Sequence, residues 1–492
     1  APVGPTPRGL ALVADRLFVT RFVSPADRGE VTEIDAVSGA SIRVWTLAED
    51  PGPDSEIGSR GIPNYLSQIV PSPDGTRLFL PAFKQNTSRG LFRDGKAMTF
   101  ETTNRAILSV LDVRAGAEDM AARVDFDNRD QAVALGLTEI GDYGFVAFQG
   151  SQSVLAVDLL NGQEIASILH VGHAPQGLLV TPDRRLFVQN FLGRDVTVYD
   201  VGTLEIASSI VRLAAIRTVA NDLLTPEQLL GKRIFYNASE QRMSRDSYIA
   251  CAGCHLEGGS DRRVWDFTDR GEGLRRTTMM RGRGGMMHGP VHWSANFDEI
   301  QDFENDIRNA FEGTGFMSDA ELDTGTRSQT LGDKKGGVSP ELDALAVYVS
   351  SLIQADESPY RASTGVLTDA AKRGRDLFRS SEVGCATCHT GPHFTDSVLP
   401  AGSSLFVVHD VGTITPASGS RMGQPLTGID TPTLKGVWNN APYLHDGSAA
   451  TLRDVLRTRN PQDKHGKTSH LTEAQLSDME AYLQQIDGRS GA

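Results

Sequence analysis

Short segments in which apolar and polar residues alternate fill the first part of the chain. FVAFQGSQSVLAVDLLNGQEIASI (145–168) aligns with FVQNFLGRDVTVYDVGTLEIASSI (187–210) at an offset of 42 residues. A V-x-V-x-D pattern, exact or looser, ends at four aspartates, Asp35, Asp112, Asp158 and Asp200. Alternation of this kind is typical of β-strands, and repeats of this length with several short strands are typical of propeller blades. We predict an all-β, propeller-like domain over residues 1–220.

The repeat count leaves the architecture of this domain partly open. Four units are clear and a fifth is weaker, and residues 84–106 are expected to form an insertion between strands. A β-sandwich with a similar number of strands is the alternative. The repeats resemble the YVTN-type propeller repeats of secreted bacterial proteins, which implies a ring of blades, although fewer blades are recognisable here than is usual for that family.

Helical signals begin near residue 222. In LTPEQLLGKRIFYN, Thr225 is the expected N-cap, Pro226 occupies the first helical position, and Gln228 completes a capping box. Two further helices are predicted at SPELDALAVYVSSL (339–352) and TEAQLSDMEAYLQQI (472–486).

These helical segments occur twice. The GKRIF segment at 231–235 is echoed by GRDLF at 374–378, and Tyr348 and Tyr482 are 134 residues apart. We predict two mainly α domains of one duplicated unit, at 221–358 and 359–492, with a linker rich in Pro, Ser and Gly near 355–366.

All four cysteines belong to two C-x-x-C-H motifs, which are also 134 residues apart. The first is Cys251, Cys254 and His255, and the second is Cys385, Cys388 and His389. In such motifs the two thiols become thioethers to a haem and the histidine binds its iron. Because both motifs occupy matching places in the duplicated unit, we predict two covalently attached haem c groups.

Composition narrows the setting of these haems. The formal net charge of −14 argues against a nucleic-acid partner. No stretch approaches eighteen apolar residues, so no membrane span is predicted. Haem c is normally attached outside the bacterial cytoplasm, and the chain begins at APVGPTPRGL without a leader. We therefore expect a mature periplasmic or secreted protein.

One C-terminal segment allows a resemblance to be named. IDTPTLKGVWNNAPYLHDGSAATLRDVL (429–456) and GCATCHTGPHFTD (384–396) resemble segments of the bacterial di-haem cytochrome c peroxidase and MauG superfamily. The resemblance covers roughly 225–490. It implies that peroxide reacts at the haem on His255 and that the haem on His389 relays electrons.

The resemblance also nominates residues around the first haem. Trp293 in VHWSANFDEIQDFE corresponds to the family's inter-haem tryptophan, although Ser294-Ala295-Asn296 departs from the family pattern. Glu312 has the spacing of the family's acid/base glutamate, with Glu304 as the rival. His292 is expected to ligate the first iron reversibly or to act in the distal pocket. His288, Met286 and Met287 are weaker ligand candidates. The alternatives are core packing for Trp293, an ordinary solvated helix carboxylate for each glutamate, and a satisfied surface or core histidine for His288 and His292.

The second haem departs from the family at its distal ligand. Family members use a Met or Tyr about fourteen residues after the histidine that corresponds to His445, but that offset reaches Arg459 here. His465 is our preferred ligand. The remaining candidates are His470, Met422 and His409. A second imidazole gives a lower reduction potential than a thioether does, because thioether ligation favours ferrous iron.

Calcium is a further group that the resemblance implies. Family members bind it through backbone oxygens of the segment that corresponds to Asn440–Pro442 and through an asparagine of the first domain. Arg281 stands about where that asparagine is expected, and a buried guanidinium there could replace the charge of the ion. His445 is expected to form hydrogen bonds between the haems rather than to bind iron.

Three functions remain open from the sequence. The preferred one is an enzyme that reacts with hydrogen peroxide or oxygen and takes electrons from a cytochrome or cupredoxin. The second is a MauG-like oxidant of a protein or organic substrate. The third is a non-catalytic electron-transfer protein whose propeller-like domain docks a partner. Oligomerisation is compatible with all three.

Overall fold

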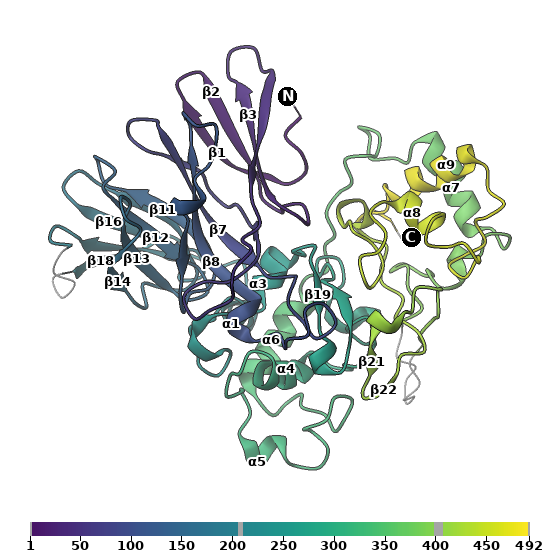
Figure 1. Cartoon of the computed structure of the whole chain (residues 1–492). Coiled ribbons are helices and arrows are strands. Elements are labelled where there is room, and N and C mark those ends of the chain that lie inside the picture. Colours follow the sequence, from purple (N-terminus) through teal and green to yellow (C-terminus); the bar gives the residue numbers. More distant parts are fainter. Residues whose placement is uncertain (1, 205–209, 398–406, 491–492) are drawn as a thin grey trace. The chain divides into compact units, whose positions relative to one another are not determined.

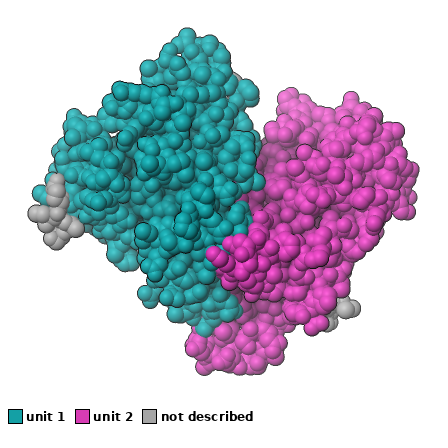
Figure 2. Space-filling model, viewed as in Figure 1, with its two compact units in different colours: residues 1–89, 99–253, 307–315 teal, residues 90–98, 254–306, 316–492 magenta. Residues whose placement is uncertain are grey.

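The computed structural model describes residues 2–204, 210–397 and 407–490 (Figure 1). Two compact units are distinguished by colour in Figure 2, namely residues 1–89, 99–253 and 307–315, and residues 90–98, 254–306 and 316–492. The division separates Cys251 from Cys254 within the first haem motif. The domain boundaries near 220 and 358 stay predictions.

The described part of the first unit contains four antiparallel sheets, which follow one another in chain order (Figure 1). The first contains β1 (Pro7–Val13), β2 (Arg16–Arg21), β3 (Gly29–Asp35) and β4 (Ser41–Leu47). The second contains β5 (Ile62–Asn64), β6 (Val70–Pro71), β7 (Arg77–Gln85), β8 (Asn104–Asp112), β9 (Ala117–Glu118) and β10 (Val124–Phe126). The third contains β11 (Ala132–Leu137), β12 (Tyr143–Phe148), β13 (Ser153–Asp158) and β14 (Glu164–Ile168). The fourth contains β15 (Pro175–Val180), β16 (Arg185–Asn190), β17 (Asp195–Asp200) and β18 (Val211–Arg217).

The repeated aspartates have one structural role in all four sheets. Each is the last residue of its strand, and its carboxylate accepts the N–H of the residue two positions later, at 2.8–3.1 Å (Asp35, Asp112, Asp158 and Asp200). Such Asx turns reverse the chain toward the next strand. The region is mostly β, as predicted, with one short helix between β7 and β8. Residues 205–209, part of the second repeat copy, lie outside the described residues, and closure into a propeller ring stays a prediction.

Apolar side chains join neighbouring sheets. One buried cluster, which includes Phe18, Trp45 and Leu80, joins the first sheet to the second. Another, which includes Phe145 and Tyr199, joins the third to the fourth. The predicted insertion corresponds to residues 86–103, which connect β7 to β8 and contain α1 (Phe100–Thr103).

Three helices form within the segments for which the sequence predicted them. α2 (Pro226–Phe235) begins after Thr225, whose side chain accepts the N–H of Gln228 in a capping box. α6 (Pro340–Ser350) and α9 (Glu473–Leu483) lie within the two predicted helical segments. The other helices are α3 (Ala252–His255), α4 (Phe303–Asn309), α5 (Asp319–Leu322), α7 (Asp369–Arg379) and α8 (Leu452–Leu456), and the short strands of the second unit are β19 (Val264–Asp266), β20 (Leu274–Arg276), β21 (Ser420–Arg421) and β22 (Gln424–Pro425). No helix among the described residues has both the length and the apolar character needed to cross a bilayer.

Close packing of α7 against α9 builds the wall behind the second haem motif. A Cβ on Gly374 would lie 1.9 Å from the backbone oxygen of Asp478, so only glycine permits this approach. Phe378 contacts Tyr482 with ring centroids 5.4 Å apart, and its ring lies 6.4 Å from that of His389. The helix pair therefore supports the histidine of the second motif through Phe378.

Candidate haem sites

The histidines of the two motifs have the same local geometry. Nδ1 of His255 lies 3.1 Å from the carbonyl oxygen of Gly259, and Nδ1 of His389 lies 3.1 Å from that of Phe394. Burial lowers the pKa of both histidines, which favours neutral imidazoles. When Nδ1–H donates to a carbonyl, the lone pair remains on Nε2, the atom used for metal ligation. Both residues therefore fit the role of a proximal haem ligand.

A cavity of about 290 Å³ lies beside the second motif, and we call it the His389 cavity. Its lining includes Cys385, Cys388, His389 and His465. The ring centroids of His389 and His465 are 6.2 Å apart. Burial, aided by the nearby His389, lowers the pKa of His465 to about 4, so this ring is also neutral at physiological pH. The paired thiols and opposed neutral imidazoles fit a covalently attached haem.

Asn460 orients the His465 loop. Its side-chain oxygen accepts the N–H of His465 at 2.8 Å, and its amide group donates to the carbonyl oxygen of Gly466 at 2.7 Å. Asn460 was not predicted from the sequence. The only local signal for this role is that Asn460 lies five residues before His465. Many asparagines in loops lie at a similar distance from a histidine, so this spacing does not predict the contact.

The other residues considered as distal ligands have different environments. His470 pairs with Glu382 at 3.0 Å, the side chain of Met422 is exposed, and Nε of Arg459 donates to the carbonyl oxygen of Ser448 at 2.7 Å. Among the predicted candidates, His465 is the one whose ring lies 6.2 Å from that of His389, a separation that suits two imidazoles on one iron.

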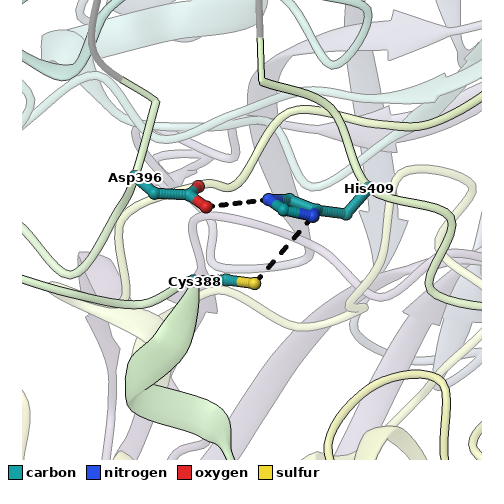
Figure 3. Close-up of side chains that lie close together, drawn as sticks. All are labelled: Cys388, Asp396 and His409. Carbon is teal, nitrogen blue, oxygen red and sulfur yellow. Dashed lines mark hydrogen bonds and ion pairs between the residues drawn. The ribbon is translucent and has the colours of Figure 1, made fainter.

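His409 also lines the His389 cavity, where it lies beside Cys388 and Asp396 (Figure 3). Its Nε2 lies 2.8 Å from a carboxylate oxygen of Asp396, and its Nδ1 lies 4.0 Å from Sγ of Cys388. Ligand atoms of these three residues lie within 4.8 Å of one another. Haem attachment would convert this sulfur to a thioether and remove the thiolate that a metal ion prefers. The cluster therefore fits a position at the haem edge better than a metal site.

His292 is held in one orientation near the first motif. Its Nδ1 lies 2.8 Å from Oδ1 of Asn296, whose amide nitrogen donates to Glu272 at 2.7 Å. The ring packs on Phe297 with centroids 4.3 Å apart, and the backbone φ of His292 is +70°. A β-carbon disfavours this left-handed conformation, so the surrounding contacts must maintain it. With Nδ1–H donated to Asn296, Nε2 carries the lone pair.

Electrostatics link His292 with two other groups. Burial chiefly lowers the pKa of His255, and His292 adds to that effect. Burial raises the pKa of Asp306, while His292 acts in the opposite direction. Asp306 was not predicted from the sequence, because its burial near His292 depends on tertiary packing.

The two predicted acid/base glutamates already have partners. Glu304 is fully buried, and its oxygens accept the backbone N–H groups of Phe316 at 2.8 Å and Met317 at 3.1 Å. Glu312 pairs with Arg245 at 3.0 Å, and its side chain is 42% exposed. It belongs to the first compact unit, whereas His255 belongs to the second. Their assignment as proton-transfer groups stays a prediction.

Trp293, the residue after His292, lines the His389 cavity. Its Nε1–H donates to the carbonyl oxygen of Arg276 at 2.8 Å, and its ring lies 6.5 Å from that of His445 in an edge-on arrangement. His445 forms a 2.9 Å hydrogen bond through Nε2 with the hydroxyl of Ser418. The buried indole of Trp293 therefore lies at the His389 cavity, and its neighbour in the sequence is His292.

The weaker ligand candidates near the first motif are placed as follows. The ring of His288 lies 4.6 Å from that of His393, and neither of its nitrogens has a hydrogen-bond partner among the described residues. Burial is the main cause that lowers the pKa of His288 to about 3. Met287 is 55% exposed and Met286 is partly buried.

The expected calcium position is occupied by a side chain. The guanidinium of Arg276 donates to the backbone oxygen of Asn440 at 2.6 Å and also to its side-chain oxygen. Arg281, the residue expected there, instead pairs with Asp356 at 2.7 Å. Calcium needs six to eight oxygen ligands at about 2.3–2.6 Å. Both oxygens of Asn440 accept N–H groups of Arg276, so Asn440 does not fit the role of a calcium ligand.

These features define a c-type cytochrome that binds haem c covalently. The profile of the RoxA-like, cytochrome c-like family matches residues 428–464. Hydrazine synthase subunit gamma of Kuenenia stuttgartiensis is 30% identical over 286 residues, which are 51% of this chain and 76% of the relative. MauG of Methylophilus methylotrophus is 23% identical over 55% of this chain and 85% of its own length, and cytochrome c peroxidase Ccp of Escherichia coli (strain K12) is 26% identical over 51% and 56%. The chain belongs to the di-haem cytochrome c family that includes these oxidoreductases.

Proposed function

We propose that the chain is a periplasmic or secreted di-haem oxidoreductase with one haem c on each C-x-x-C-H motif. Peroxide reacts at the haem on His255, and electrons arrive from a redox protein through the haem on His389. Support comes from the matching hydrogen bonds of His255 and His389 and from relatives that include a cytochrome c peroxidase. The propeller-like unit is proposed to dock the redox partner through its loops.

The short distance between the rings of His389 and His465 is the observation that carries this proposal. A centroid separation of 6.2 Å would allow both imidazoles to hold one haem iron. A haem held in this way would leave no position for peroxide and would supply electron transfer. When bound, the two haems supply the redox-active iron of the reaction. The first site is therefore the proposed place of peroxide chemistry.

Proton transfer at the first site is assigned to His292 and Asp306. Cleavage of peroxide needs a group that accepts a proton from one oxygen and returns it to the other. His292 carries its lone pair on Nε2 while Asn296 and Glu272 fix the ring through Nδ1. Asp306, whose pKa is raised by burial and lowered by His292, is the proposed partner of His292 in proton transfer. Both glutamates are less suited, because Glu304 holds a loop and Glu312 pairs with Arg245.

Spectroscopy of the holoprotein tests this assignment. We expect one low-spin ferric haem and one high-spin ferric haem, with peroxide consuming only the high-spin signal. His292→Gln should slow peroxide turnover by roughly 10²–10⁴-fold, the usual contribution of an acid/base group. His470→Gln is the matched control, since that ring pairs with Glu382. Two low-spin haems in every state and no turnover would instead identify an electron-transfer protein.

The nature of the electron donor separates the two enzymatic alternatives. Steady turnover with a reduced cytochrome or cupredoxin indicates a peroxidase. Oxidation of a protein or organic substrate, with no need for an external donor, indicates a MauG-like reaction. Trp293→Phe should slow electron delivery in either case, because phenylalanine is much harder to oxidise than tryptophan.

A further inference from the structure

Two arginines bind consecutive asparagines beside the His389 cavity. The guanidinium of Arg276 donates to the backbone oxygen of Asn440 at 2.6 Å and to its side-chain oxygen. The guanidinium of Arg262 donates to Oδ1 of Asn439 at 2.5 Å. Asn440 lines the cavity, as does Arg276. Two positively charged side chains therefore contact one short segment, residues 439–440.

The backbone of Arg276 makes two further connections. Its N–H donates to the carbonyl oxygen of His445 at 2.7 Å, and its own carbonyl oxygen accepts the indole N–H of Trp293 at 2.8 Å. Arg276 ends β20, where it pairs with Val264 of β19. One residue thus connects the proposed relay tryptophan to His445 and Asn440.

The positive charge of Arg276 is buried but persists at neutral pH. Only 4% of the residue is exposed, and burial lowers its pKa to about 10, with Asp261 acting in the opposite direction. Among the described residues, no carboxylate lies within ion-pair distance of its guanidinium. Oxygens of Asn440 therefore solvate the charge, as neutral oxygens do for a bound calcium ion.

We propose that Arg276, together with Arg262, is a built-in cationic clamp that takes the place of calcium beside the His389 cavity, while the backbone carbonyl of Arg276 holds Trp293 there. The two guanidinium groups carry the same formal charge as one calcium ion. A fixed positive charge near a haem favours its reduced form, so the clamp raises the reduction potential of the haem on His389. This inference rests on the proposed function only for the presence of that haem, not for the peroxide reaction.

Redox titration of the holoprotein tests the clamp without reference to turnover. Arg276→Met should lower the midpoint potential of the low-spin haem by about 59 mV, the equivalent of a tenfold change for a one-electron couple. Coulomb's law gives an effect of this order for a single charge at a distance of about 10 Å in a medium with an effective dielectric constant of about 20, and Arg276 lines the cavity itself. Arg276→Lys should retain most of the potential, because it keeps the charge while losing the paired contacts with Asn440.

Arg281→Met is the matched control, since Arg281 lies in the same segment but pairs with Asp356. It should leave the potential unchanged. Treatment with EDTA, followed by added calcium, should change neither the potential nor the thermal midpoint of the wild-type holoprotein. The clamp is refuted if Arg276→Met titrates like Arg281→Met, or if EDTA shifts these values and calcium restores them. Either measurement remains valid whether or not peroxide is the substrate.

Discussion

Removal of the His465 imidazole is the sharpest test of the proposed haem arrangement. The ring centroids of His389 and His465 are 6.2 Å apart. If both imidazoles bind one iron, two metal–nitrogen distances of about 2 Å and two distances of roughly 1.1 Å from nitrogen to ring centre add up to about the same separation. His465→Ala should therefore open one axial position of the second iron, while His389 remains bound on the opposite side.

The expected result is spectroscopic. In His465→Ala the low-spin ferric haem should become high-spin, and added imidazole should restore the low-spin signal by entering the space left by the ring. His465→Met should keep the haem low-spin and raise its midpoint potential by on the order of 100 mV, within the roughly 0.8 V range set by axial ligands.

The control is His470→Ala, which removes an exposed imidazole from the same loop region. Its spectrum and potential should match those of the wild type. A persistent, imidazole-insensitive low-spin signal in His465→Ala would show that another residue ligates the second iron. That result would refute the geometric reasoning, which rests on the 6.2 Å separation of the His389 and His465 rings.

Two predictions concern stability. Lys335→Met should lower the free energy of unfolding, measured by urea denaturation, by about 3–5 kcal/mol, because it leaves the buried carboxylate of Asp302 without its partner at 2.5 Å. Lys334 is exposed, so Lys334→Met should change this free energy by less than about 0.5 kcal/mol. Equal effects of the two substitutions would contradict this reasoning. Burial raises the pKa of Asp130 well above its usual range. The protonated carboxyl therefore contributes stability that is fully present below the pKa of the unfolded state, about pH 4. This contribution is lost as the pH rises through the pKa of the folded state. Asp130→Asn should remove this loss between pH 4 and 8, and exposed Glu139→Gln should not; parallel curves for all three proteins would refute a buried Asp130 carboxyl.

Local features could be predicted because their causes lie within a few residues. The start of α2 at Pro226 follows from the capping box of Thr225 and Gln228, whose groups are three positions apart. The repeated aspartates could be recognised for the same reason, since each accepts an N–H two residues later. The C-x-x-C-H pattern that predicts covalent haem attachment likewise occupies five consecutive residues at each motif.

Long-range partners could not be predicted with the same certainty. His465, His470 and His409 can all ligate iron, so residue type alone does not distinguish them. The tertiary structure does, because it places the ring of His465 6.2 Å from that of His389 and pairs His409 with Asp396. The spacing of Glu304 suggested acid/base chemistry, yet its oxygens hold the backbone of residues 316 and 317.

The sequence by itself determined the two haem motifs, the duplicated helices and the repeated β-strands, because periodicity, capping and C-x-x-C-H chemistry act over short distances. Only the tertiary structure decided that Arg276 rather than Arg281 reaches Asn440, and that Asp306 lies near His292. A side chain's ability to ligate, donate or carry charge is a property of its residue type. Which partner it meets depends on the packing of segments far apart in the chain.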